Sequence, residues 1–303
     1  MRLPRSFDQL LRVPPDRRAA MQTALLARVA REEWPLVPAL RARLQEAGLD
    51  ADRARPADRL AGLAPLPQGR LAAAPPPHLR PTPDPARIRR HWGAGRKFGL
   101  VLARGKGGAL LQRGYVPVPE TTDQVGALAV ESTQHDLELL REQLIRCALL
   151  LGLTGRTPIA AEGALLPAAL RAALPTAAHP EEAPRRAQPA PLLLVADPST
   201  MEDALSRASD PDSVLCVAEH IDPRWPTAVW SPALRLLLPA VEGRRALLFD
   251  DLVALGHGHE SGLIIATHLA HHGTMLARVL LPGTESWELL PAAGSGLPLV
   301  AGL

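Results

Sequence analysis

The chain has 303 residues, of which 47% are hydrophobic and 21% charged, and its formal net charge is +3 at pH 7. This length supports a large core in one or two domains, and the composition is that of a globular, soluble protein. No apolar signal region begins the chain and no apolar run nears the roughly 20 residues that span a bilayer, which predicts a cytoplasmic protein without a membrane partner. Cys147 and Cys216 lie in separate apolar stretches, which predicts buried free thiols rather than a disulfide.

The amino-terminal part of the chain is predicted to be helical. Helices are expected over residues 17–31 and 36–47, the second ending at Gly48, which suits a left-handed cap. Pro56 is expected to open a third, short helix, because proline fits the first helical turn. A proline-rich connector over residues 72–85 follows, then a basic segment over 87–97 and an apolar strand over 98–103.

Strands and helices alternate in the middle of the chain. Ser132 is expected to cap a long helix over residues 133–151, whose leucines form one apolar stripe. A second proline-rich connector covers residues 175–189. Beyond it we expect a strand over 192–196, a helix over 199–208 and a strand over 214–217.

After about residue 240 the hydrophobic period changes to two. Strands are predicted near residues 246–255, 263–269, 275–281 and 287–290. The pattern predicts an α/β fold with a helical amino terminus, an α/β core and an antiparallel carboxy-terminal β subdomain. We divide it into a helical segment (1–80), a first α/β portion (81–190) and a second α/β portion with the β subdomain (191–303), with 81–303 forming one compact unit.

Several segments are similar, in order and rough spacing, to motifs of one enzyme family. They are Glu33–Leu44, Glu46–Asp50, Asp58–Pro67, Thr133–Leu153, Glu260–Leu269 and Gly273–Arg278. Together they resemble the phenylacetate–CoA ligase branch of the adenylate-forming enzymes. The resemblance implies the amino-terminal domain of that fold, in which ATP with magnesium and then CoA serve to activate a carboxylic acid.

The sequence departs from the family pattern at the positions that bind the nucleotide and catalyse the reaction. The segment Pro119–Gly126 aligns with the family's phosphate loop, yet it carries Glu120 and Asp123 where glycines would let backbone N–H groups surround phosphate. The nearest counterpart of the adenine motif is Val217–His220. No lysine follows Lys106, so the catalytic lysine and the carboxy-terminal lid domain of the family are expected to be missing.

The resemblance therefore predicts a degenerate homologue, a pseudoenzyme that binds a protein partner or a small carboxylic acid. No catalytic residue is assigned. An active acid–CoA ligase (AMP-forming) completed by a lid from another chain is the alternative, and it alone requires ATP, magnesium and CoA. Its nucleotide contacts would be Thr121, Thr122, Arg278 and Glu285.

Two further clusters are weighed against simpler interpretations. The basic segment 87–97 could contact nucleic acid, but the small net charge favours a solvated face. A dense group of imidazoles and one carboxylate could hold zinc: His257, His259, Glu260, His268, His271 and His272. Because nothing in the spacing fixes a third ligand, we predict a histidine-rich turn with exposed ends and no metal.

Overall fold

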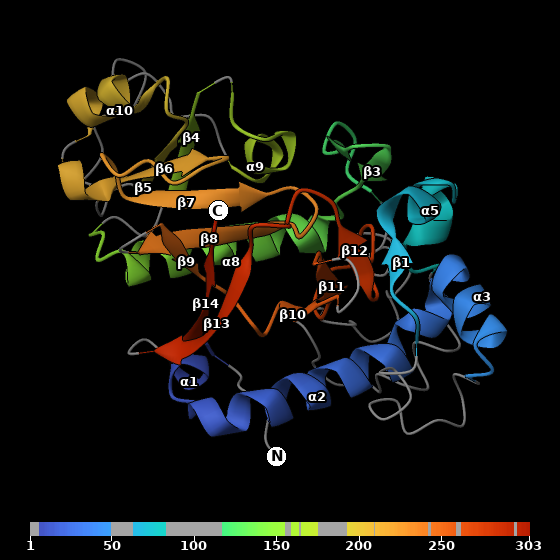
Figure 1. Ribbon diagram of the computed structural model, residues 1–303. Coiled ribbons are helices and arrows are strands. Elements are labelled where there is room, and N and C mark those ends of the chain that lie inside the picture. The colour runs from blue at the N-terminus through green and yellow to red at the C-terminus, as the bar shows by residue number, and fades with distance from the viewer. Residues whose placement is uncertain are drawn as a thin grey trace, which may run out of the picture. The chain divides into compact units, whose positions relative to one another are not determined.

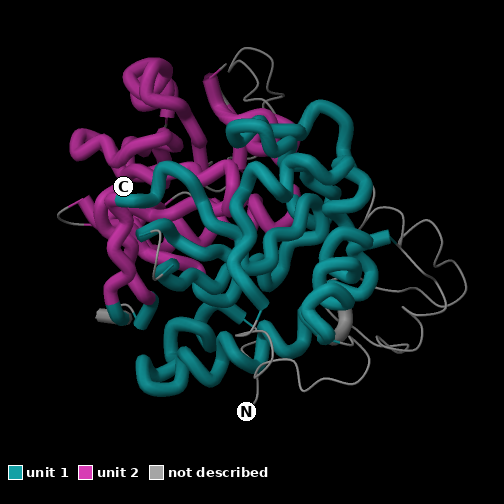
Figure 2. The backbone as a smooth tube through the Cα atoms, turned by 45° about the vertical axis from the view of Figure 1, so that its right-hand side comes forward, with its two compact units in different colours: residues 1–136, 250–285, 291–297 teal, residues 137–249, 286–290, 298–303 magenta. Residues whose placement is uncertain are grey.

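The computed structural model describes residues 6–49, 63–82, 117–154, 159–163, 165–174, 193–208, 210–241, 244–258, 262–293 and 296–303. The chain forms two compact units built from alternating segments (Figure 2). The first comprises residues 1–136, 250–285 and 291–297, and the second comprises 137–249, 286–290 and 298–303. The helix predicted from Pro56, the basic segment 87–97, the strand 98–103 and the connector 175–189 lie outside the described residues.

The first unit begins with helices that local sequence signals set. They are α1 (Phe7–Leu11), α2 (Pro15–Glu32), the 3₁₀ helix η1 (Trp34–Leu36), α3 (Pro38–Glu46), α5 (Gln68–Ala72) and the 3₁₀ helix η2 (Pro76–Leu79). The predicted helices over 17–31 and 36–47 are confirmed. Gly48 has a φ of +65°, and the N–H groups of Gly48 and Leu49 donate to the carbonyls of Gln45 and Leu44. These two hydrogen bonds end α3 in a Schellman motif, which the glycine at position 48 permits.

The helices of this unit cover a small core. Trp34 is fully buried at the turn between α2 and α3. Its neighbours are apolar side chains from α2, from α3 and its cap, from the segment before β1 and from the segment that follows residue 274: Val29, Ala30, Val37, Leu40, Leu44, Leu63, Met275 and Ala277. Burial of such side chains typically contributes about 1.5–3 kcal/mol each, so this cluster fixes the amino-terminal helices in place.

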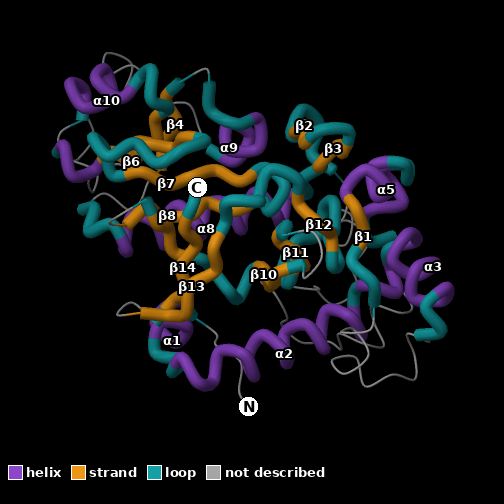
Figure 3. Tube along the Cα trace, in the orientation of Figure 1, coloured by secondary structure: helices purple, strands orange, loops and turns teal. Residues whose placement is uncertain are grey.

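The sheet of the first unit has the order β1-β12-β11-β10 (Figure 1). Strands β10 (Val253–His257), β11 (Ile264–His268) and β12 (Val279–Leu281) pair in antiparallel fashion, and β1 (Leu66–Pro67) adds to β12 in parallel. The predicted antiparallel region is thereby confirmed in part. Strands β2 (Asp123–Val125) and β3 (Leu128–Val130) form a separate two-stranded ribbon (Figure 3).

The single strand predicted over residues 246–255 is wrong. The structure has two strands there, β9 (Arg245–Leu247) and β10, in different sheets. Between them, both carboxylate oxygens of Asp250 accept hydrogen bonds from Nη1 of Arg18 at 2.7 and 2.8 Å, and both side chains are buried. A buried carboxylate needs such a cation, so the chain turns towards α2 at this point instead of continuing as one strand.

The second unit contains most of an eight-stranded sheet with the order β13-β14-β9-β8-β7-β6-β5-β4. Its parallel half consists of β4 (Ile159–Glu162), β5 (Leu193–Ala196), β6 (Val214–Ala218) and β7 (Thr227–Ser231). The remaining strands are β8 (Leu236–Val241), β9, β13 (Glu288–Ala293) and β14 (Leu297–Ala301), and β8, β9 and β14 pair in antiparallel fashion. The predictions of β5 and β6 are confirmed, and all their residues up to Val217 are buried, as expected of a parallel sheet.

Helices lie against this sheet (Figure 1). The long helix α8 (Gln134–Leu150) confirms the predicted helix, and α9 (Ala168–Ala173) and α10 (Met201–Arg207) are short. The buried amide of Gln143 accepts from the N–H of Leu237 at 2.9 Å and donates to the carbonyl of Arg235 at 3.1 Å. It thus fixes α8 to the start of β8. No described helix is both long and apolar enough to cross a membrane.

Candidate functional site

The segment predicted to replace the phosphate loop is a turn followed by the β2–β3 hairpin. Glu120 adopts a φ of +65°, which is unusual for a residue with a side chain. The hydroxyl of Thr121 is fully buried and donates to the carbonyls of Val118 (2.8 Å) and Ser132 (3.3 Å), whereas Thr122 is exposed. The hydroxyl of Thr121 therefore points towards backbone carbonyls, one in its own turn and one in the segment after the hairpin.

The other two predicted nucleotide contacts lie near β12. Arg278 has a φ of +51°, and its Nε donates to the carbonyl of Leu63 at 2.6 Å. Arg43 lies beside it, and burial together with the charge of Arg278 lowers the pKa of Arg43 to about 10. Glu285 is exposed, in the turn after β12. The guanidinium groups of Arg278 and Arg43 thus form a positive region at the predicted nucleotide contact Arg278.

A buried carboxylate organises the start of α8. The side chain of Asp136 accepts hydrogen bonds from N–H and Oγ1 of Thr133 (2.8 and 2.9 Å) and from the N–H groups of His272 (2.9 Å) and Gly273 (2.8 Å). A Cβ at Gly273 would lie 2.0 Å from the carbonyl oxygen of Glu131, so only glycine fits there. Thr133, rather than the predicted Ser132, is the helix cap, because its hydroxyl also accepts the Asp136 N–H at 3.4 Å.

The electrostatics of this carboxylate follow from its neighbours. Burial alone would raise the pKa of Asp136, but His271, His135, His272 and the Thr133 N–H outweigh burial and hold that pKa at about 2. Burial, with the charge of His272, lowers the pKa of His135 to about 3. Asp136 is thus ionised at neutral pH, and His135 is neutral.

The histidines predicted to form a turn with exposed ends are packed inside the first unit. His268, His271 and His272 are buried, whereas His257 is exposed. The rings of His135 and His272 stack at 4.1 Å, and those of His268 and His271 lie 4.4 Å apart. The prediction of exposure is therefore wrong for three of these residues, because the turn folds over Asp136.

Metal binding at this cluster was the competing interpretation. Nε2 of His272 lies 3.6 Å from Oε2 of the buried Glu33. Among the described residues, no three His, Cys, Asp or Glu side chains are arranged to hold a metal ion. Two members of the sequence cluster, His259 and Glu260, lie outside the described residues.

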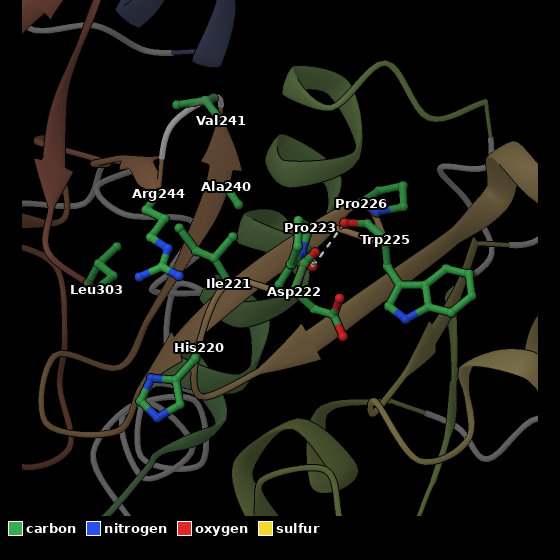
Figure 4. Close-up of a pocket in the computed structure, with 11 residues that line it drawn as sticks. His220, Ile221, Asp222, Pro223, Trp225, Pro226, Ala240, Val241, Arg244 and Leu303 are labelled. Atoms are coloured by element: carbon green, nitrogen blue, oxygen red, sulfur yellow. Dashed lines mark hydrogen bonds between the residues drawn. The ribbon is translucent and has the colours of Figure 1, made fainter.

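The second unit contains a pocket of about 530 Å³ (Figure 4). It is lined by the crossover that joins β6 to β7, by the end of β8 and by Arg244, the residue before β9. Its lining residues are His220, Ile221, Asp222, Pro223, Trp225, Pro226, Thr227, Ala240, Val241, Arg244 and Leu303. The sequence singled out only His220, as part of the adenine-motif counterpart. The remaining signal was the turn-forming pattern of Asp222, Pro223 and Pro226, which marks a loop without indicating a pocket.

The crossover of this pocket is held by its own polar contacts. Asp222 accepts from Nε of Arg224 at 3.0 Å and from Nη2 at 2.6 Å, and these bonds lower the pKa of Asp222. The guanidinium of Arg224 also lies over the ring of Trp225, 5.7 Å from its centroid. The hydroxyl of Thr227 donates to the carbonyls of Asp222 and Trp225. These contacts give the pocket a defined wall without a bound molecule.

The two thiols of the second unit are predicted to react slowly. Both cysteines are free and buried, as the sequence indicated. Burial and the charge of Asp222 raise the pKa of Cys216 to about 11, and burial raises the pKa of Cys147 further. Because the thiolate is the reactive form, we expect a thiol-specific disulfide reagent at pH 8 to modify the native protein far more slowly than the denatured protein. Rapid modification of either cysteine in the folded chain would contradict this.

Comparison with known proteins supplies the fold. No protein-family model and no curated protein matches the sequence. The chain is similar to 2-hydroxyisobutyryl-CoA ligase with 2-HIB-AMP and CoA in the thioesterification state, at 14% identity and a TM-score of 0.54, over 99% of this chain and 72% of the ligase. It is also similar to the open conformation of that ligase with 2-HIB-AMP and CoA, at 13% identity and a TM-score of 0.53, over 98% of this chain and 72% of the ligase. The chain therefore has the fold of the adenylate-forming enzymes.

Proposed function

We propose that this chain binds a small carboxylic acid on an adenylate-forming fold and does not activate it with ATP. The carrying observation is the buried hydroxyl of Thr121, which donates to the backbone carbonyls of Val118 and Ser132. A phosphate loop requires donors that face the ligand, and glycines that let the backbone approach it. This turn instead has Glu120 at a positive φ and the half-buried Asp123 at the start of β2.

From the ligands of the similar structures, we propose that this chain binds the acid and not the nucleotide. Both reported structures contain 2-HIB-AMP together with CoA. Negative side chains at the phosphate position would repel ATP, while a carboxylic acid needs only one cation and an apolar surface. Each lost electrostatic donor typically costs on the order of 10²–10³ in rate, and such losses do not simply add. We therefore favour a pseudoenzyme that has kept the fold of the phenylacetate–CoA ligase branch.

An active acid–CoA ligase is the second candidate, because Arg278 and Arg43 give the predicted site a positive region. In that case Arg278 would contact phosphate, Thr122 and Glu285 would contact the nucleotide, and another chain would supply a lid. If the chain binds a protein partner instead of an acid, we expect neither ATP nor any acid to bind it.

We expect no ATP-dependent chemistry from the isolated chain. Calorimetry with ATP and magnesium should show no binding, and pyrophosphate exchange over a panel of aromatic and fatty acids should stay at background. Some acids of the panel should raise the melting temperature without ATP, because a ligand that binds only the folded state stabilises it. Tight ATP binding, or exchange above background with any acid, would overturn the proposal in favour of the ligase.

A further inference from the structure

We propose that the pocket of the second unit is a binding site for a small organic anion, with Arg244 holding the anionic group. The pocket is lined by the crossover from His220 onwards, by the end of β8 and by Arg244, and its volume of about 530 Å³ suits a compact ligand. This inference rests on the proposed acid-binding function and assigns it a site within one compact unit.

The charges on the pocket wall favour an anion. The carboxylate of Asp222 is already neutralised by two nitrogens of Arg224. The hydroxyl of Thr227 is occupied by two backbone carbonyls. Arg244 and His220 are exposed, and no hydrogen bond or ion pair of either side chain occurs among the described residues. The wall therefore presents one guanidinium and one imidazole that keep N–H groups to offer a ligand among the described residues.

The backbone at Arg244 supports a role for its side chain. Arg244 has a φ of +57°, a conformation that disfavours every residue with a Cβ and that glycine or asparagine adopts more readily. A turn between β8 and β9 would thus be better served by glycine. Strained residues cluster at binding sites, and a guanidinium on a pocket wall is matched in geometry to carboxylate or phosphate.

The rest of the wall indicates the body of the ligand. Most of the other lining side chains are apolar, namely Ile221, Pro223, Trp225, Pro226, Ala240, Val241 and Leu303 (Figure 4). An apolar group of moderate size can bury its surface there, while its anionic end reaches Arg244. The ligand class is therefore an aromatic or short branched monoanion, either a carboxylate or a phosphate monoester.

The pocket lies along the crossover between two parallel strands. Its lining begins at His220, two residues beyond the carboxyl end of β6, and reaches Thr227 at the amino end of β7, beside Ala240 and Val241 at the end of β8. Ligands of open α/β sheets bind beyond the carboxyl ends of the parallel strands, so part of the lining belongs to the edge at which such ligands are found.

The test compares the full-length chain with two matched variants, Arg244→Gln and Arg245→Gln. Both remove one exposed cation from neighbouring positions, but only Arg244 lines the pocket. Calorimetric titrations use benzoate, phenyl phosphate and the neutral benzamide as probes. We expect one of the two anions to bind the unaltered chain and Arg245→Gln alike, and to bind Arg244→Gln about 10- to 100-fold more weakly. Preference between the anions identifies carboxylate or phosphate as the recognised group.

Several results would overturn the site. They are no binding of either anion, equal binding by Arg244→Gln, or benzamide binding as tightly as benzoate. If Arg244→Gln melts at a lower temperature, Arg244→Lys replaces it, and failure of lysine to retain more affinity than glutamine counts against the site. ATP binding or pyrophosphate exchange would overturn the proposed function without affecting this result. Acid binding that ignores Arg244 would leave the proposed function and remove the site.

Discussion

Replacing Asp136 by asparagine is expected to lower the free energy of unfolding by about 3–5 kcal/mol, the usual cost of breaking a buried charged network. Four donors converge on this carboxylate, from Thr133, His272 and Gly273. An asparagine amide keeps one acceptor oxygen and turns its NH₂ group towards N–H groups that then have no acceptor. The loss concerns both the start of α8 and the turn that leads to β12.

Urea denaturation followed by circular dichroism measures the effect. Glu138→Gln is the matched control, because Glu138 lies two residues further along α8 and is exposed. We expect this control to stay within about 0.5 kcal/mol of the unaltered chain. A similar small change for Asp136→Asn would show that the buried carboxylate does not hold the turn.

The stability of the chain is expected to fall as the pH drops below about 6.5, because the half-buried imidazole of His135 resists protonation. The pKa of His135 is about 3 in the folded chain, against an ordinary value of 6.5. The unfolded chain therefore binds a proton that the folded chain does not, and stability is lost between these two values. At about 1.4 kcal/mol per unit the loss is at most about 5 kcal/mol, and partial exposure of this ring reduces it.

Asp136 adds to acid sensitivity at lower pH. Its pKa is about 2 when folded, against 3.8 ordinarily, so its contribution is present above 3.8 and disappears as the pH falls through 2. The two groups thus act in the same direction but in successive windows of pH.

His135→Gln separates the contribution of the imidazole. Nε2 of His135 lies 3.0 Å from the carbonyl oxygen of Ala270, and a glutamine amide can donate to the same oxygen without titrating. We expect the free energy of unfolding of this variant to change less between pH 6.5 and pH 4 than that of the unaltered chain. His257→Gln, at an exposed position, should keep the original slope. Equal slopes for all three proteins would exclude His135 as the source.

Much of the secondary structure could be predicted because its signals are local. The apolar stripe of α8, the proline at the start of α2 and the glycine after α3 act within a few residues of chain. The apolar runs of β5 and β6 likewise indicate buried parallel strands. The order of weakly similar segments indicated the adenylate-forming fold, which the structural comparison supports.

The helices, the buried strands and the fold class depend on the spacing of side chains along the chain, so they could be predicted. What distant residues do together depends on the folded chain. The tertiary structure divided the apolar run over 246–255 through the Arg18–Asp250 pair, and it buried His271 and His272 over Asp136. It also placed Arg244 in the same pocket as the crossover after β6. These residues are too far apart in the sequence for a local hydrophobic pattern to predict that they share a pocket. Burial and electrostatic pairing depend on which segments meet in space, and only the folded chain specifies that.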